Sequence, residues 1–227
     1  MFLVRVKICG IQCLEEGKSA VAAGVHALGF VFAESPRKVS PVQAQQVIRK
    51  LPPWISKVGV FVNEDIELVN EIGTFCGLDT LQFHGEETPN YCSRFPGYKI
   101  IKTFSVTSDW NAERETRTIS MYPVDALLLD TCYPDIKGGG GKTFNWAIAA
   151  SFQAEGSLKL PLVLAGGLNQ DNVSTALEKV NPFGLDLSSG VESQGKKDPE
   201  KIKAFMQQVH NWNYEQILGH VSCGGEK

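Results

Sequence analysis

Residues 160–193 read LPLVLAGGLNQDNVSTALEKVNPFGLDLSSGVES, and this stretch contains the pattern that decides the fold. An apolar run at 160–165 ends at a pair of glycines, a stretch with helical spacing follows, and a second apolar run occupies 183–187. Two serines and a glycine come directly after the second run. The pattern predicts a strand, a helix and another strand, with a glycine-containing loop after each strand.

The same unit of apolar run and helical stretch recurs along the rest of the chain. The eight runs are 3–8, 27–32, 57–62, 79–83, 98–104, 124–129, 160–165 and 183–187. Residues that commonly cap helices precede four of the helical stretches, namely Ser40, Asn63, Ser108 and Asn145. Strand and helix are therefore expected to alternate eight times.

The length of the repeated unit helps to choose the architecture. Several runs are almost entirely apolar, which is typical of strands covered on both faces of a parallel sheet. Eight units in 227 residues leave about 28 residues for each, which favours a closed (β/α)8 barrel of the α/β class over an open, doubly wound sheet. No linker divides the chain, so we expect one domain over 1–227, with 210–227 as the end of the last helix and a C-terminal tail.

Composition excludes several classes of function. The chain has 22 Lys and Arg against 25 Asp and Glu, and the net charge of −3 comes without a basic cluster, which argues against binding to nucleic acid. The apolar runs are far shorter than the roughly 20 residues that cross a membrane. The N-terminus lacks a secretory signal and the six cysteines form no CxxC pair, so we expect a cytoplasmic protein with free thiols.

Polar and glycine residues gather where the apolar runs end. In a parallel barrel these ends lie together and form the active site. The residues at these positions are Cys9, Arg37, His84, Asp130, Gly166, Gly167, Ser188, Ser189 and Gly190. The set predicts a reactive site at one end of the barrel.

Cys9 and Asp130 are candidates for proton transfer, although each also has a simpler interpretation. Cys9 fits a small buried hydrophobe, and as a catalytic group it needs a nearby charge or dipole because only about 3% of an ordinary thiol is ionised at pH 7. Asp130 fits a turn residue, and as an acid it needs a pKa raised by burial or by a bound anion. The sequence leaves both interpretations open.

The glycine loops after 160–165 and 183–187 predict a phosphate site. Glycines there let main-chain N–H groups approach an anion, and a helix N-terminus after Ser188 and Ser189 would add a favourable dipole. Ordinary turns and serine caps are the alternative. The run GGGGKT at 138–143 lacks the spacing of a nucleotide-binding loop, and it suggests a mobile loop that closes over substrate.

The remaining charged residues are weaker candidates. Arg37 either binds a carboxylate through two hydrogen bonds or faces solvent. His84 has no partner at metal-binding spacing, so we expect it in the wall of the site and expect no metal. Three charged doublets are expected on solvated faces without a role: Glu15 with Glu16, Glu86 with Glu87, and Lys196 with Lys197.

The motifs at the strand ends, taken in order, resemble those of a known family. They are KICG, GFVF with SPR, VGVFVN, LQFHGEE, LLLDT, GGGGKTFNW, LAGGLNQDNV and LDLSSGVESQGKKD, and they span about residues 4–206. Together they resemble the phosphoribosylanthranilate isomerases of tryptophan biosynthesis. The resemblance implies a (β/α)8 barrel that converts N-(5-phosphoribosyl)anthranilate to 1-(2-carboxyphenylamino)-1-deoxyribulose 5-phosphate by an Amadori rearrangement, with no cofactor and no metal.

The resemblance also implies roles for individual residues. Cys9 matches the family's general base, Asp130 its general acid, and Arg37 the arginine that holds the anthranilate carboxylate. The glycines of LAGGL and the SSG segment match the site of the ribose phosphate, and Asp186 matches an aspartate near the ligand.

Some alternatives stay open at this stage. Gly140 and Asn145 depart from the family's usual hydroxyl residue and aspartate, but neither is the implied acid or base. Two functions compete with this one. The chain could be another cofactor-free phosphosugar isomerase or epimerase barrel, or a catalytically silent barrel that binds a phosphate ligand. The expected partner is a small phosphoribosyl substrate, and the sequence does not separate a monomer from a homodimer.

Overall fold

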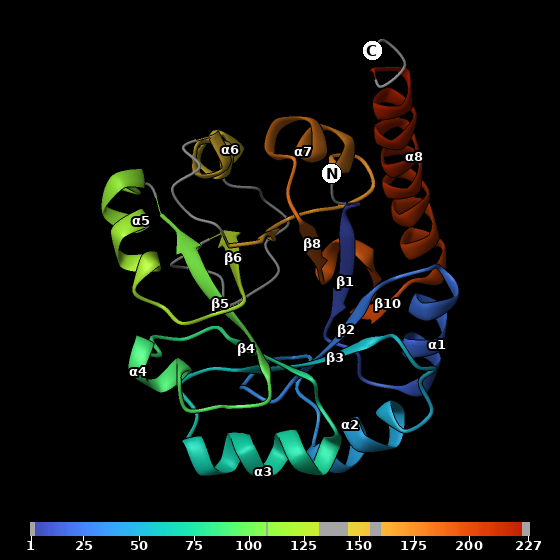
Figure 1. Ribbon diagram of the computed structural model, residues 1–227. Coiled ribbons are helices and arrows are strands. Elements are labelled where there is room, and N and C mark those ends of the chain that lie inside the picture. Colours follow the sequence, from blue (N-terminus) through green and yellow to red (C-terminus); the bar gives the residue numbers. More distant parts are fainter. Residues whose placement is uncertain (1–2, 108, 132–144, 155–159, 224–227) are drawn as a thin grey trace.

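The chain forms a closed barrel of eight parallel strands surrounded by helices (Figure 1). The computed structural model describes residues 3–107, 109–131, 145–154 and 160–223. The barrel strands are β1 (Arg5–Cys9), β2 (Ala27–Val31), β3 (Ser56–Phe61), β4 (Thr80–Phe83), β5 (Lys99–Val106), β6 (Ala126–Thr131), β7 (Leu162–Leu164) and β8 (Gly184–Leu187). Each strand pairs with the next, and β8 pairs with β1, so the predicted (β/α)8 barrel is confirmed.

The strands form at all eight predicted apolar runs, with ends that differ by at most two residues. Two of these differences matter for the site. β1 extends to Cys9 because this residue still pairs with Gly29 of β2, and β6 extends to Thr131, which pairs with Val106 of β5. Cys9 and Asp130 therefore belong to the strands themselves, which hold them more firmly than loops would.

Helices follow the barrel strands and form the outer layer. In the described residues they are α1 (Leu14–Ala22), α2 (Pro41–Ile48), α3 (Ile66–Cys76), α4 (Pro89–Cys92), α5 (Ala112–Ser120), α6 (Trp146–Ala154), α7 (Val173–Val180) and α8 (Pro199–Cys223). None of the described helices has the length and apolar character that a membrane span requires.

The helix caps show how the sequence fixes the starts of these elements. The Ser40 hydroxyl accepts a hydrogen bond from the Gln43 N–H and caps α2, and the Asn145 side chain accepts one from the N–H of Ala147 in α6. The predicted cap at Asn63 is wrong, because α3 begins two residues later, after the carboxylate of Asp65. Asn63 instead adopts a positive φ of 50° in the preceding loop.

Some expectations fall on parts of the chain that the structure does not describe. These are the cap at Ser108, the loop at 138–143 with its departure at Gly140, and the last four residues of the tail.

The apolar core has two parts. The larger cluster lies between the strands and the helices and contains fully buried side chains such as Ile8, Phe30 and Phe205. The smaller cluster consists of Ala126, Leu128, Val163 and Ala165, with Ile101 packed against it. Buried polar side chains also occur on the barrel strands, among them Lys7, Gln82, Thr103 and Asp186.

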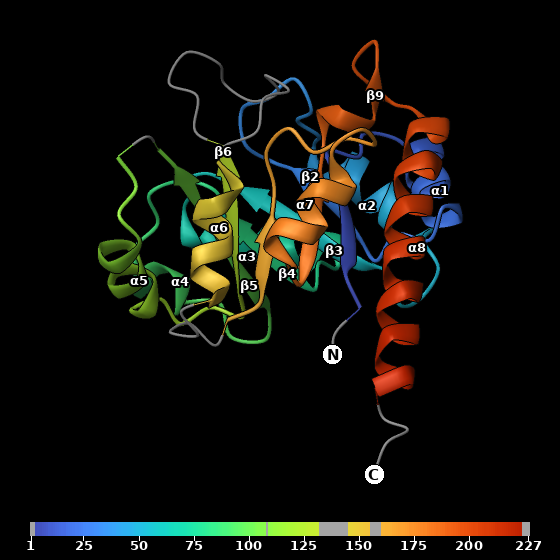
Figure 2. The ribbon, with the colours of Figure 1, turned by 90° about the horizontal axis from the view of Figure 1, so that it is seen from above.

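A short hairpin follows β8 and lies at the mouth of the barrel. A 3-10 turn, η1 (Ser189–Val191), leads into β9 (Glu192–Ser193) and β10 (Lys196–Lys197) before α8 begins. Figure 2 shows β9 at the end of the barrel where the strands finish, with the start of β1 and the end of α8 at the opposite end. The predicted helix N-terminus after Ser188 and Ser189 is wrong, because a three-residue turn is too short to provide a helix dipole.

Candidate active site

The two candidates for proton transfer lie at the same end of the barrel. Cys9 is the last residue of β1, and Asp130 is the last but one of β6. All barrel strands run in parallel, so both side chains belong to the mouth where the strands finish. The Asp130 carboxylate accepts a hydrogen bond of 2.7 Å from the Thr131 N–H.

A buried ion pair connects the strands that close the barrel. Lys7 of β1 pairs in register with Asp186 of β8, and its Nζ lies 2.9 Å from each carboxylate oxygen. Both side chains are less than a tenth exposed. Lys7 and Asp186 act electrostatically on Cys9 and also on Asp130, so the thiol and the carboxyl group share one electrostatic environment.

Burial determines the charge states of the two candidates. It raises the pKa of the Cys9 thiol above its ordinary value, while the charge of Lys7 is the largest opposing influence. Burial likewise raises the pKa of Asp130, and the nearby His84 is the largest influence that lowers it. A raised pKa keeps more of Asp130 protonated near neutral pH, as a general acid requires.

His84 faces Asp130 across the mouth. Its Nε2 lies 3.6 Å from an Asp130 oxygen, and burial lowers the pKa of the imidazole, so the ring is mainly neutral at pH 7. A second buried ion pair, between Lys102 and Glu87 at 3.1 Å, supports the loop that carries His84. Glu87 accepts from the Gly85 N–H, and Lys102 donates to the Gly85 carbonyl at 2.8 Å.

The loop after β7 has the geometry that the sequence predicted. Gly166 and Gly167 have φ values of 86° and 64°, which side chains rarely adopt. A Cβ on Gly166 would lie 2.9 Å from an Asp130 oxygen and even closer to Thr131. Within the part of the chain that the structure describes, the N–H groups of Gly166 and Gly167 donate to no protein acceptor. They are therefore available to an anion.

The loop after β8 packs directly on the loop after β7. A Cβ on Gly190 would lie only 1.8 Å from the carbonyl oxygen of Leu168. Ser188 fixes the loop on its other side, because its hydroxyl donates to the Cys9 carbonyl at 3.1 Å. Ser189 begins the 3-10 turn. The structure thus brings together the glycine and serine residues that the sequence predicted for a phosphate site.

Arg37 lies at the mouth but already has a partner. Its Nε and Nη2 atoms donate to the two carboxylate oxygens of Glu192 at 2.7 and 2.8 Å. Glu192 also accepts from Lys197 at 2.5 Å, and these hydrogen bonds outweigh burial and lower the pKa of Glu192 to about 2. Gly10 leaves room for the arginine, since a Cβ there would lie 2.6 Å from Arg37 Cδ.

The expectation that the charged doublets face solvent is wrong for one member of each pair. Glu16, Glu87 and Lys197 are buried. Glu16 accepts from the Lys197 N–H at 3.1 Å and so ties α1 to the hairpin. A pair of adjacent charged residues suggests exposure to solvent, but the folded chain can bury one of the two when an ion pair or main-chain hydrogen bonds satisfy it.

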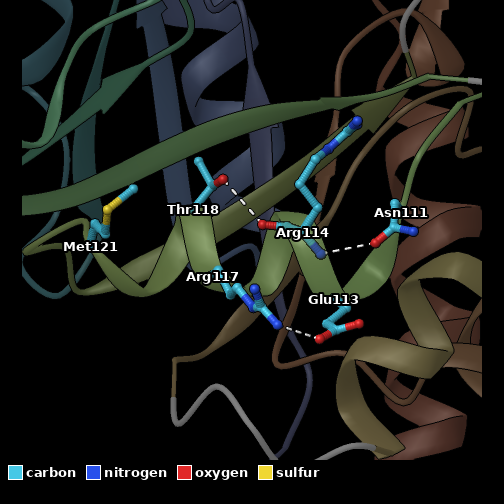
Figure 3. Close-up of a pocket in the computed structure, with 6 residues that line it drawn as sticks. All are labelled: Asn111, Glu113, Arg114, Arg117, Thr118 and Met121. Atoms are coloured by element: carbon cyan, nitrogen blue, oxygen red, sulfur yellow. Dashed lines mark hydrogen bonds and ion pairs between the residues drawn. The ribbon is translucent and has the colours of Figure 1, made fainter.

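Features elsewhere on the described surface lie apart from the predicted site residues. No group of three His, Cys, Asp or Glu side chains that could hold a metal occurs among the described residues. A hollow on α5 is lined by Asn111, Glu113, Arg114, Arg117, Thr118 and Met121 (Figure 3). These residues belong to one outer helix and its ends, and Glu113 pairs with Arg117 along it. None of them is a sequence candidate.

The fold is that of a (β/α)8-barrel enzyme, and an aspartate, a cysteine and two glycine-containing loops lie at its mouth. The sequence model of N-(5'-phosphoribosyl)anthranilate isomerases matches residues 6–208. The chain belongs to the N-(5'-phosphoribosyl)anthranilate isomerase family, and it is an isomerase of tryptophan biosynthesis.

Individual relatives agree with this assignment. An N-(5'-phosphoribosyl)anthranilate isomerase of Pelobacter propionicus is 48% identical over 206 residues, covering 90% of this chain and 94% of the relative. The crystal structure of the Thermotoga maritima isomerase superposes with a TM-score of 0.82 at 39% identity, covering 92% and 99% of the two chains. A further isomerase structure, with a TM-score of 0.78 at 36% identity and the same coverage, holds reduced 1-(o-carboxyphenylamino)-1-deoxyribulose 5-phosphate. The Thermotoga maritima enzyme is described as dimeric.

Proposed function

We propose that Cys9 and Asp130 are the general base and the general acid of the Amadori rearrangement of N-(5'-phosphoribosyl)anthranilate in this chain. The observation that carries the proposal is their position, since they come from distant parts of the sequence yet finish strands at one mouth. Both also respond to Lys7 and Asp186, which supports a shared site between them.

The reaction follows from the chemistry of these two groups. Asp130 protonates the furanose ring oxygen as the ring opens, and the product is a protonated Schiff base with the anthranilate nitrogen. The Cys9 thiolate then removes the proton from carbon 2 of the ribose. The iminium accepts the electron pair that this step releases, so the enolamine forms without a redox cofactor and tautomerises to the aminoketone. Each positioned proton transfer typically contributes 10²- to 10⁴-fold to the rate.

The substrate's two anionic groups have separate partners in this proposal. The phosphate lies against the N–H groups of Gly166, Gly167 and the turn at Gly190, which is supported by the free donors of the β7 loop. Arg37 binds the anthranilate carboxylate. Its Nη1 atom has no partner among the described residues, because Glu192 engages only Nε and Nη2.

The first test measures turnover through the loss of anthranilate-type fluorescence. Cys9→Ser and Asp130→Asn are each expected to lower kcat by at least about 10²-fold, with the far-UV circular dichroism of the barrel unchanged. Exposed residues of the same types provide matched controls, Cys13→Ser and Asp171→Asn, and should retain normal turnover. Near-normal kcat in either site variant would refute the assignment.

Arg37→Ala separates binding from chemistry. Loss of a charged hydrogen-bonding group that holds the substrate in both ground state and transition state should raise KM by at least about tenfold, with a smaller change in kcat. An unchanged KM would remove Arg37 from the binding site.

A further inference from the structure

Lys7 is a buried charge that the proposed reaction does not use. Its side chain is 7% exposed, and its Nζ donates to both oxygens of Asp186 at 2.9 Å. Burial alone would lower the pKa of Lys7, but Asp186 and Cys9 more than compensate and the pKa is raised, so the group is an ammonium at neutral pH. Burying an ion pair costs desolvation free energy, and a protein with two apolar residues in its place is often at least as stable.

The position of Lys7 connects it to the proposed base. Lys7 and Cys9 are two residues apart on β1, so their side chains lie on the same face of the strand. Gly29 of β2 pairs with Cys9, and a Cβ on Gly29 would lie 3.0 Å from Cys9 Sγ, Lys7 Cε and Lys7 Nζ alike. The charge of the ammonium acts on the Cys9 thiol and favours its ionised form. The missing side chain at position 29 thus leaves the space in which the two groups meet.

The other charges that face Cys9 are already engaged. Lys197 of β10 donates to Glu192 and to Ser188, and Arg37, after β2, binds Glu192 through two hydrogen bonds. Asp186 of β8 acts in the opposite sense, since its negative charge favours the neutral thiol. Among these groups, Lys7 exerts the largest influence that favours the thiolate.

We propose that Lys7 is a positioning residue that sets the balance between thiol and thiolate at Cys9, and that Asp186 limits its effect. The inference deepens the proposed function and rests on it for its catalytic meaning. When Cys9 takes the proton from carbon 2, the proton moves to sulfur and Lys7 keeps its own. Its ammonium therefore stabilises the reactive thiolate before the transfer and remains charged after it.

The test measures the thiolate directly. The full-length protein is alkylated with iodoacetamide as a function of pH, and the modification of each cysteine is followed by peptide mass spectrometry. Only the thiolate reacts, so the rate reports its fraction. In Lys7→Met, Cys9 should react at least about tenfold more slowly at pH 7, because a nearby positive charge is gone. In Asp186→Asn, Cys9 should react at least about threefold faster.

Shifts of opposite sign distinguish this role from a structural one, because loss of packing or of folding would change both variants in the same direction. Exposed Cys13 is the internal control and should keep its profile in every variant. Buried Cys76 and Cys92, whose pKa values burial raises to about 11, should stay protected and so report an intact barrel. Equal or same-sign changes at Cys9 in folded variants would overturn the proposal.

Two further results keep the test decisive. If Lys7→Met exposes Cys76 and Cys92, Asp186→Asn decides alone, and an unchanged or slower reaction at Cys9 overturns the proposal. Lys7→Arg keeps the charge and should retain much of the wild-type profile. Normal turnover in Cys9→Ala would refute Cys9 as the proposed base, and the alkylation results would still stand. If Cys9→Ala is inactive but the reactivity of Cys9 does not change in the Lys7 and Asp186 variants, only the role of Lys7 is refuted.

Discussion

Glu192 joins several basic side chains at the mouth. It binds Arg37 through two hydrogen bonds, accepts from Lys197, and its main-chain carbonyl accepts from Lys201 at 2.6 Å. The side chain is 9% exposed, so solvent screens these contacts little. A single carboxylate therefore fixes the direction of the guanidinium that we assign to the substrate.

Glu192→Gln tests this role. An amide keeps the shape but loses the charge that orients Arg37, so KM should rise by roughly tenfold while kcat changes less than about threefold. Glu34→Gln is the matched control, because Glu34 is exposed and pairs only with Lys38. An unaltered KM in Glu192→Gln would show that Arg37 needs no such partner.

The low pKa of Glu192 predicts an effect of acid on stability. The folded-state pKa of about 2 lies below the ordinary 4.5, so the stabilisation is fully present above pH 4.5 and is lost as the pH falls toward 2. The difference corresponds to about 3 kcal/mol. Urea unfolding at several pH values should show a shallower loss of stability in Glu192→Gln, and equal slopes for both proteins would contradict this.

Single residues also show where sequence reasoning succeeds and fails. Cys9 and Asp130 were predicted because strand ends in a parallel barrel converge. Lys7 was missed, although Arg5, Lys7 and Cys9 alternate along one face of a strand, which is a readable signal for an inward lysine. Glu192 and Lys197 had no such signal, because their burial depends on Arg37, which is 155 residues away from Glu192 in the chain.

At the scale of elements, the loops after β7 and β8 act as one unit. The sequence predicted their glycines but also a helix after Ser189, where the chain instead forms a 3-10 turn and a hairpin. The hairpin could not be predicted, because β9 and β10 have only two residues each and show no strand pattern.

Gly190→Ala tests the contact between these loops. Its Cβ would lie 1.8 Å from a main-chain oxygen, so the two loops must separate and the donors for phosphate must move. We expect KM to rise by at least about tenfold and inhibition by inorganic phosphate to weaken. Gly219→Ala in α8 is the control, since a Cβ there meets nothing within 4 Å. Equal KM values in the two variants would count against the loop assignment.

At the scale of the whole molecule, the first half of α8 is buried against the barrel, whereas several described side chains of its second half are exposed. Ile202, Phe205, Met206 and Val209 are fully buried, whereas Tyr214, Ile217 and Leu218 are exposed, and Figure 2 shows the helix continuing past the barrel. The side chain of Asn213 exchanges two hydrogen bonds with the main chain of Val4, at 2.9 and 3.1 Å. Asn213 thus connects α8 to the segment that precedes β1.

Two truncations to alanine measure this division. Phe205→Ala should lower the free energy of unfolding by about 3–5 kcal/mol, because it leaves a cavity in the core. Ile217→Ala should lower it by less than about 1 kcal/mol, since its side chain already faces solvent. Urea denaturation followed by circular dichroism provides both values. Similar losses of unfolding free energy in the two variants would contradict the exposed position of Ile217.

The overall architecture could be predicted from the sequence, because eight similar units of about 28 residues favour a closed (β/α)8 barrel over an open sheet. The partners across the closure were not. Lys7 and Asp186 stand 179 positions apart, and only the register of β1 with β8 brings them together.

That separation has a consequence for protein synthesis. During synthesis β1 leaves the ribosome before β8, so Lys7 is made before its partner, which lies 179 positions further along the chain. Until β8 has been synthesised, the Lys7 ammonium lacks its carboxylate partner. The ion pair that we infer controls the thiol therefore cannot form before then. Polypeptides that stop before Asp186 would therefore lack this pair and, with it, the control of the thiol that we infer.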